Sequence, residues 1–288
     1  MYNFMKYGYT NTGNCTLTKV LDSTTISINI CMKLRDGCAM EEFKVKSLAK
    51  AVKLLECFSM ERPELGIKEL SEMLDIQKST AHNIADTFKK LGYLSQNPET
   101  NKYFLGLGLL KFSYTINNHL GFRNFFLPFM EKISGQTNEV VFLGIPHGGE
   151  VLYLECYFPT GSRATRNILG ERAHMHCTGL GKAMLAFLPE QEQNKYATAR
   201  LKKFTERTIT TAPLLLEELA QIRNRGYAID NMEHEHGVTC VAIPVFSAGN
   251  QIVAALSTSA PSLRLDDESI TRVAEIMRTT LEPAQYIL

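Results

Sequence analysis

The chain has 288 residues, of which 44% are hydrophobic and 21% are charged, and its formal net charge is +1. This composition is typical of a globular protein, and the length leaves room for two domains. The small net charge excludes a polybasic coat for nucleic acid and an acidic tail, and no apolar run approaches the roughly 20 residues that span a bilayer. We therefore expect a cytoplasmic protein without a membrane partner.

The seven cysteines are scattered and never form a Cys-x-x-Cys pair. Their odd number and irregular spacing favour reduced thiols in a reducing compartment over a disulfide framework. They are Cys15, Cys31, Cys38, Cys57, Cys156, Cys177 and Cys240.

Residues 1–39 follow none of the patterns found later in the chain. They are rich in Thr, Asn and Ser, and they lack the apolar core and small-residue cleavage site of a signal peptide. We predict that they are either a leader read in frame upstream of a start at Met40 or a disordered tail.

Helical periodicity begins near Lys46. An apolar stripe recurs at helical spacing and predicts a helix that packs on a core through Leu48, Ala51, Val52, Leu55 and Phe58. Residues 66–104 then predict two short amphipathic helices about one turn apart, followed by two short strands around an Asn-Pro-Glu-Thr-Asn turn. Together these elements predict a winged helix-turn-helix over residues 44–106.

The solvent face of the second short helix carries the small and polar side chains with which a helix approaches base edges in a major groove. Lys and Arg outnumber Asp and Glu only slightly in residues 44–106, so the electrostatic signal for DNA is weak. Two amphipathic helices with a hairpin also occur in ordinary cores and in protein-docking domains. From the residues alone, DNA binding and protein docking are both open.

The rest of the chain predicts a linker and a second domain. Residues 107–122 lack proline, carry apolar residues at helical spacing and predict a linker helix. In residues 123–288, β-branched apolar runs alternate irregularly with helical segments, and Asp266 is a candidate cap for the last helix. Strands without strict βαβ alternation predict an α+β fold for this domain.

The chain resembles the IclR (isocitrate-lyase-regulator) family of bacterial transcription factors. The resemblance runs from about residue 45 to residue 288 and is specific at Lys-Ser-Thr-Ala-His, residues 78–82, which is similar to the Lys-Ser-Thr-Val-His of the family's recognition helix. The sequence departs from the family at Gln77, where proline is common, and at Asn83, where arginine is common. The loss of an arginine at this position removes one phosphate contact or changes the base that is read, so a match to the operators of relatives is not assumed.

The resemblance implies a DNA-binding domain over residues 44–106, here called the reading head, followed by a helical linker and a GAF-like effector-binding domain. It also implies a homodimer or homotetramer, because two-fold proteins read two-fold operators on double-stranded DNA. Contacts to base edges are predicted for Ser79, Thr80, His82 and Asn83. Contacts to phosphates are predicted for Lys78, Lys89, Lys90 and Lys102.

Three segments resemble the family motifs that border a small-molecule pocket, at residues 174–182, 230–240 and 256–261. The predicted effector-binding residues are Gly179, Leu180, Asp230, Cys240, Ser257 and Ser259. A glycine turn that enters a helix favours an anion, and the two serines share one face of a strand by period two. We expect a small carboxylate, such as a sugar acid or short keto acid. Close packing at Gly179, a buried Cys240 and strand-end serines are the structural alternative.

The same segments hold an unusual collection of nitrogen and sulfur donors. Zinc takes about four such ligands, often two from a short local spacing. A zinc site is therefore a second hypothesis for these segments, with the ligands His174, His176, His234 and His236. Ordinary histidines at a pocket rim are the alternative, and no cofactor is required for the main hypothesis.

We conclude from the sequence that the chain regulates transcription and is not an enzyme. No common catalytic motif occurs in a plausible context, and the acidic residues beside Cys240 disfavour a thiolate nucleophile. The alternatives are a metabolite sensor whose winged helix docks protein, and a cysteine- or metal-dependent enzyme built on the C-terminal domain.

Overall fold

The computed structural model describes residues 43–119, 121–162 and 168–286. The predicted leader, residues 1–39, lies outside them. Among the described helices, none is long and apolar enough to cross a bilayer.

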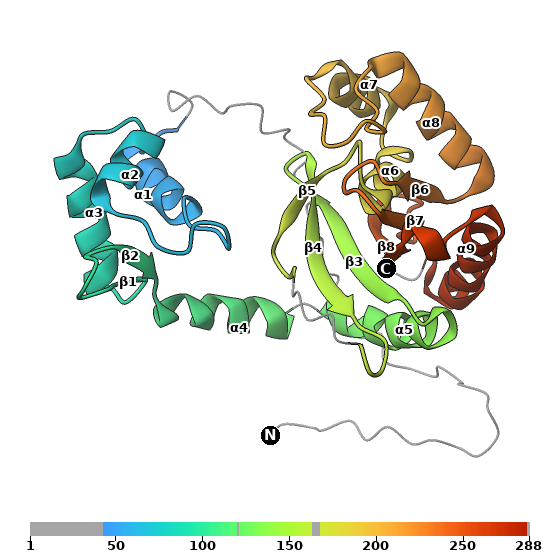
Figure 1. Ribbon diagram of the computed structural model, residues 1–288, viewed down its shortest axis with the longest axis horizontal. Helices are drawn as coiled ribbons and strands as arrows, with labels where there is room; N and C mark the ends of the chain where they lie inside the picture. Colours follow the sequence, from blue (N-terminus) through green and yellow to red (C-terminus); the bar gives the residue numbers. More distant parts are fainter. Residues whose placement is uncertain (1–42, 120, 163–167, 287–288) are drawn as a thin grey trace. The chain divides into compact units, whose positions relative to one another are not determined.

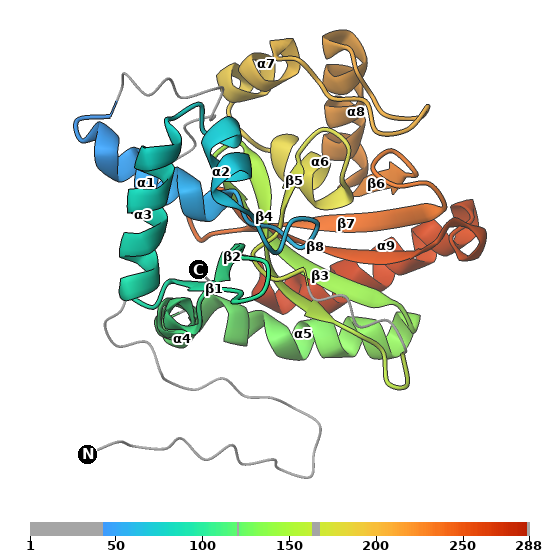
Figure 2. The same ribbon diagram turned by 60° about the vertical axis from the view of Figure 1, so that its left-hand side comes forward.

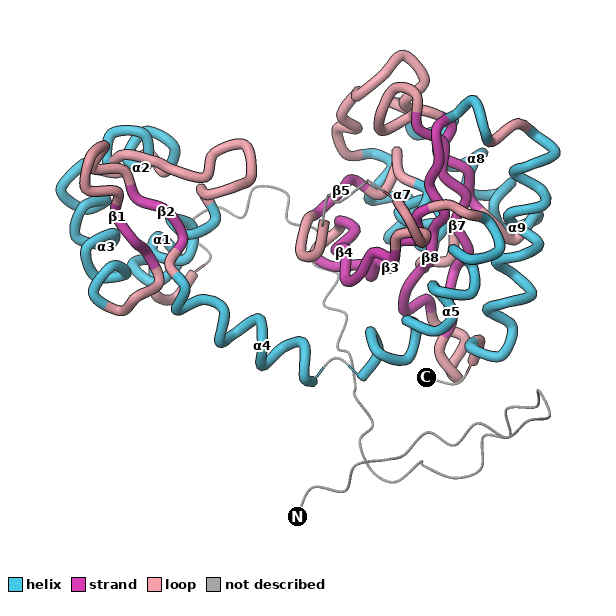
Figure 3. The backbone as a smooth tube through the Cα atoms, turned by 60° about the horizontal axis from the view of Figure 1, so that its bottom comes forward, coloured by secondary structure: helices cyan, strands magenta, loops and turns pink. Residues whose placement is uncertain are grey.

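The N-terminal domain is a winged helix-turn-helix. Its helices are α1 (Lys46–Glu56), α2 (Ile67–Met73) and α3 (Lys78–Lys90), and its wing pairs β1 (Leu94–Gln96) with β2 (Tyr103–Leu105) in antiparallel register (Figures 1 and 3). Leu65 bridges to Tyr103 and so joins the α1–α2 loop to the wing. A small core holds these elements together: Leu54, Cys57, Phe58, Leu65, Leu70, Ala85, Leu94 and Tyr103.

The apolar stripe predicted for α1 is partly wrong. Leu54 is fully buried and Phe58 is 8% exposed, whereas Leu48 and Val52 are 62% and 47% exposed. The core face of α1 is therefore rotated away from the predicted stripe, because two of the apolar residues at helical spacing belong to a surface and not to the core.

A helical connection follows the wing. A 3-10 turn (Leu107–Leu109) leads into α4 (Leu110–His119), and α5 (Gly121–Thr137) follows. The start of α4 packs on the N-terminal domain, where the rings of Phe112 and Tyr93 lie 5.6 Å apart between centroids.

The C-terminal domain is built on a six-stranded sheet of order β5-β4-β3-β8-β7-β6, in which neighbouring strands are antiparallel. The strands are β3 (Val140–His147), β4 (Glu150–Tyr157), β5 (Arg172–His174), β6 (Ala228–Asn231), β7 (Val238–Phe246) and β8 (Ile252–Pro261). This antiparallel sheet with helices on its faces confirms the predicted α+β class.

Helices cover both faces of the sheet (Figure 2). On one face, α5 and α9 (Asp267–Leu281) enclose a core that includes Phe126 and Met277. On the other face, α6 (Gly179–Leu185), α7 (Glu190–Thr198) and α8 (Ala212–Arg225) enclose a second core. Asp266 caps α9 as predicted, since its carboxylate accepts the N–H of Ser269 at 2.9 Å.

Candidate nucleic-acid interface and small-molecule cavity

Helix α3 presents the predicted base-reading residues to solvent. Gln77 precedes the helix in extended conformation, and Ala81 and Ala85 are buried against the domain core. The side chains on the opposite face are exposed at Lys78, Ser79, His82 and Asn83, and Thr80 is half-buried. The first turns of α3 therefore offer an accessible polar face, which is the part of a recognition helix that reaches base edges.

Three of the four predicted phosphate-binding lysines already have partners within the domain. Lys90 pairs with Asp86 at 2.7 Å, and Lys102 lies 3.3 Å from Glu69. Lys89 donates to the side-chain oxygen of Gln96 at 2.7 Å, while Lys78 is exposed at the start of α3. Exposed pairs of this kind contribute at most about 1 kcal/mol, so a phosphate can compete for these ammonium groups.

The predicted effector-binding residues gather around one cavity in the C-terminal domain. In the sheet register, Asp230 of β6 lies opposite Cys240 of β7, and Cys240 lies opposite Ser259 of β8. Ser257 is two residues from Ser259 on β8, so the two side chains lie on the same face of the sheet, which is the face that α6 covers. Gly179 and Leu180 in the first turn of α6 complete the set.

The cavity has a volume of about 430 Å³, within the range of small-molecule sites. Aromatic side chains form one wall, where the rings of Phe142 and Tyr153 meet edge to face at 5.8 Å. Charged groups line it at Glu171, Arg172 and Glu235, and Arg172 is also 3.4 Å from Glu150. Apolar and aromatic side chains form most of the cavity surface, as the sequence predicts, but charged and polar side chains border it at more positions than expected, and the binding roles of these residues remain predictions.

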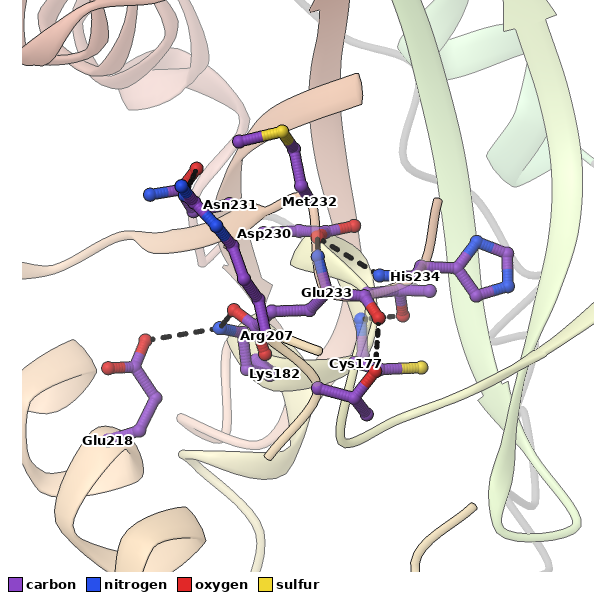
Figure 4. Close-up of polar contacts among 12 residues, drawn as sticks. Cys177, Lys182, Arg207, Glu218, Asp230, Asn231, Met232, Glu233 and His234 are labelled. Carbon is purple, nitrogen blue, oxygen red and sulfur yellow. Dashed lines mark hydrogen bonds and ion pairs between the residues drawn. The ribbon is translucent and has the colours of Figure 1, made fainter. Parts of the chain in front are cut away.

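Asp230 is the most perturbed carboxylate at the cavity. It is 3% exposed, and its Oδ1 accepts the N–H of Glu233 at 2.8 Å and that of His234 at 3.4 Å (Figure 4). Burial raises the pKa of Asp230 to about 7, and these hydrogen bonds offset only part of that effect. Asp230 therefore changes charge near neutral pH, beside the cavity.

The thiols near the cavity are not poised as nucleophiles. Burial raises the pKa of Cys240 and of Cys177 far above the usual range of a thiol. Cys240 accepts a hydrogen bond from Ser259 at 2.9 Å, and the surrounding carboxylates further oppose its ionisation. A neutral thiol in this setting packs as a small apolar group, which removes the physical basis of the cysteine-enzyme alternative.

The four histidines of the zinc hypothesis do not converge on one point. The rings of His174, His176 and His234 pack around Phe204, at centroid distances of 5.3, 6.4 and 5.2 Å. His236 is exposed and lies 3.6 Å from Glu206. Within residues 43–119, 121–162 and 168–286, no three His, Cys, Asp or Glu side chains are placed to hold a metal ion. The zinc hypothesis therefore has no geometric support in this part of the chain.

Sequence reasoning missed two features of the site. Tyr153 lines the cavity from β4, and Lys182, on the helix whose first turn lines the cavity, is buried with an exposed fraction of 1%. The only sequence signal for Lys182 is a lone charge inside the apolar run Gly-Leu-Gly-Lys-Ala-Met-Leu of residues 179–185. Tyr153 had no signal beyond period two in its strand.

Comparison with known proteins identifies the family. The family model of the IclR helix-turn-helix domain matches residues 47–98. The family model of the bacterial transcriptional regulator IclR C-terminal domain matches residues 115–284. The chain belongs to the IclR family of bacterial transcriptional regulators. Both alternatives from the sequence give way to this assignment, since family and relatives are named as transcriptional regulators and not as enzymes.

Relatives in this family match most of the chain. The HTH-type transcriptional regulator XynR of Escherichia coli K12 is 32% identical over 80% of this chain and 92% of its own length. The regulator KdgR of the same strain is 32% identical over 82% of this chain and 89% of its own length. Because an IclR-type reading head and C-terminal domain are both present, the chain is a DNA-binding regulator with an effector-binding domain.

Solved structures show the same fold. The Thermotoga maritima IclR is 27% identical, with a TM-score of 0.63 over 82% of this chain and 96% of that chain. An IclR homolog from Microbacterium hydrocarbonoxydans, solved in complex with 4-hydroxybenzoate, is 24% identical, with a TM-score of 0.68 over 82% of this chain and 99% of that chain.

Proposed function

We propose that this regulator reads a two-fold operator as a homodimer, or as a pair of dimers, and that a small carboxylate in the C-terminal cavity controls the reading. The observation that carries the proposal is the convergence of Asp230, Cys240 and Ser259 in one row across three strands, at a cavity of small-molecule size. Its target is chromosomal DNA, so it acts in the cytoplasm. The proposal requires no cofactor and no metal.

Exposed apolar side chains support a dimer. On α1 they are Leu48 and Val52, and on the 3-10 turn and α4 the exposed fractions reach 81% at Leu107 and 72% at Tyr114. Apolar groups at this density on short helices are typical of surfaces that another protein covers. A second copy of the chain meets this requirement and supplies the second reading head for a two-fold operator.

A carboxylate suits the polar end of the cavity. The first N–H groups of α6, at Gly179 and Leu180, have no acceptor within their own helix, and the hydroxyl of Ser257 can donate, whereas that of Ser259 is engaged with Cys240. The apolar and aromatic remainder accommodates a carbon skeleton. A related IclR homolog was solved with 4-hydroxybenzoate, which is an acid of this kind.

The direct test is selection of genomic fragments with the purified dimer, followed by footprinting with and without gluconate, pyruvate and 4-hydroxybenzoate. We expect a protected two-fold site whose occupancy changes with one acid. Binding no tighter than to random duplex at low salt would overturn the reading-head assignment, and an unresponsive footprint with all three acids would count against the carboxylate class.

Two substitutions separate base reading from phosphate binding. We expect His82→Ala to reduce the ratio of operator to random-duplex affinity about tenfold, because a base contact is worth roughly 1–3 kcal/mol. We expect Lys102→Ala to weaken binding to both duplexes equally, because it removes a phosphate contact. For the same reason, the slope of log K against the logarithm of the salt concentration should become shallower by about one.

Fluorescence anisotropy from 50 to 200 mM salt measures both effects. Lys195→Ala on α7 of the C-terminal domain is the control and should leave both affinities unchanged. Equal losses on both duplexes for His82→Ala would contradict its assignment to base reading.

Filling the cavity should uncouple the regulator from its effector. Ser259→Leu adds an apolar side chain that occupies part of the cavity, and it also removes the hydrogen bond from Ser259 to Cys240. We expect operator affinity without acid to stay within about twofold of wild type, and the thermal shift caused by the responsive acid to disappear. An undiminished shift would place the acid elsewhere.

A further inference from the structure

A buried ion-pair network joins two segments whose neighbouring residues line the cavity. The ammonium group of Lys182 on α6 forms an ion pair with Glu233 and lies 3.3 Å from Glu218 on α8, with Lys182 between the two carboxylates in Figure 4. Glu218 also binds Arg225 at 2.8 Å. The side chains of Lys182 and Glu233 are 1% and 8% exposed, so this pair is almost completely removed from water.

Stability alone does not account for this pair. Removing two charges from water carries a large desolvation penalty, and a well-packed apolar pair is often equally stable or more so. What a buried pair supplies is a directional attraction that only one arrangement of the two segments satisfies. The question is therefore which segments the pair of Lys182 and Glu233 holds in place.

The pair connects two walls of the cavity. In the first turn of α6, Gly179 and Leu180 line the cavity, whereas Lys182 is buried and does not line it. In residues 230–237, Asp230 and His234 line the cavity, whereas the side chain of Glu233 meets Lys182. Each wall thus has one side at the cavity and contributes one charged group to the connection.

Residues 230–237 need such a connection because their backbone is irregular. Met232 and Gly237 have positive φ values of 60° and 77°. The 205–208 segment holds the main chain, since Thr205 donates to the carbonyl of Met232 at 2.7 Å and Thr208 donates to that of Glu233 at 2.6 Å. Among the described residues, the contact of the Glu233 carboxylate with Lys182 ties this segment to α6, whose first turn forms a neighbouring wall of the cavity.

We propose that Lys182 is a positioning residue of the cavity, whose ion pair with Glu233 fixes the spacing between the α6 wall and the 230–237 wall. The proposal rests on the proposed function only in that the cavity binds the effector. The spacing itself can be measured without any ligand.

The test compares Lys182→Met, Lys182→Arg and the double variant Lys182→Met/Glu233→Gln in the full chain. Met removes the charge at similar volume and leaves Glu233 unpaired, Arg keeps a charge, and the double variant removes both charges. Arg278→Met is the matched control, because Arg278 forms an exposed pair with Glu275 on α9. Thermal unfolding reports global stability for each protein.

Two measurements report local position. Hydrogen–deuterium exchange with peptide resolution follows residues 228–240, and mass spectrometry follows labelling of Cys240 by iodoacetamide. We expect Lys182→Met to increase both rates at least tenfold, with little change in the α5 and α9 core. We expect Arg to restore most of the protection and Arg278→Met to match wild type.

The double variant separates positioning from a merely structural role and remains informative if the single Met variant does not fold. We expect it to recover thermal stability, because no unpaired charge is left, while fast exchange in residues 228–240 and fast labelling of Cys240 persist. Wild-type exchange and labelling in the double variant would overturn the proposal. An increase spread evenly over the whole domain in Lys182→Met would also overturn it.

Binding of gluconate, pyruvate and 4-hydroxybenzoate by calorimetry then connects position to function. If one acid binds wild type, we expect at least tenfold weaker binding to the double variant, and unchanged affinity would overturn the functional part of the proposal. If none binds wild type, the carboxylate class of the proposed function fails, while exchange and labelling still decide the role of Lys182.

Discussion

Gly181→Ala is expected to destabilise the C-terminal domain by about 3 kcal/mol, near the upper end for a single added methyl group. A Cβ at this position would lie 2.3 Å from Cα and 2.5 Å from the carbonyl oxygen of Met175. Both contacts are with backbone, so no side-chain rotation relieves them. Met175 is itself held in place, since it is buried and its N–H donates to the Tyr196 hydroxyl at 3.0 Å.

Gly135→Ala is the matched control, because it adds the same methyl group to helix α5 where nothing lies within 4 Å. In that position alanine favours the helix and restricts the unfolded chain, so we expect a gain of up to about 1 kcal/mol. Chemical denaturation of both variants gives the two free energies of unfolding. A loss below about 1 kcal/mol for Gly181→Ala would show that α6 can move away from Met175.

The motifs predicted much of the site because they lie on strands with fixed register. Ser257 and Ser259 share a face by period two, and the register of β6, β7 and β8 then places Asp230 and Cys240 beside them. The recognition helix was equally accessible to prediction, since buried Ala81 and Ala85 alternate with polar residues at helical spacing.

Other features depend on partners that a local pattern does not specify. Leu48 and Val52 fit a core stripe by spacing, yet they are exposed, because α1 offers more apolar surface than its own domain covers. The histidines share a sequence neighbourhood, but His236 turns to solvent while the other three rings pack around Phe204. Lys182 has its partners 36 and 51 residues away, beyond any local periodicity.

Asp230→Asn should stabilise the protein at pH 8 and have little effect near pH 4. In the folded chain, burial holds the pKa of Asp230 at about 7, compared with 3.8 when the group is unperturbed. As pH rises from 4 to 7, ionisation of this carboxyl therefore lowers the free energy of the unfolded chain, while the carboxyl of the folded chain stays largely protonated. The resulting penalty, about 2–4 kcal/mol, is fully present above pH 7.

Asparagine escapes this penalty because it stays neutral, and its oxygen can still accept the N–H of Glu233. Asp266→Asn supplies a control of opposite sign. The Asp266 carboxylate caps α9, and the hydrogen bonds from Ser269 hold the pKa of Asp266 below the usual range, so the stability it provides is present at pH 8 and is lost in acid.

Calorimetric Tm values at pH 4, 6 and 8 should therefore show a gain for Asp230→Asn that grows with pH and a loss for Asp266→Asn that grows with pH. A pH-independent difference for Asp230→Asn would mean that the cavity keeps this carboxylate ionised, and hence that an anionic effector would meet a fixed negative charge at neutral pH.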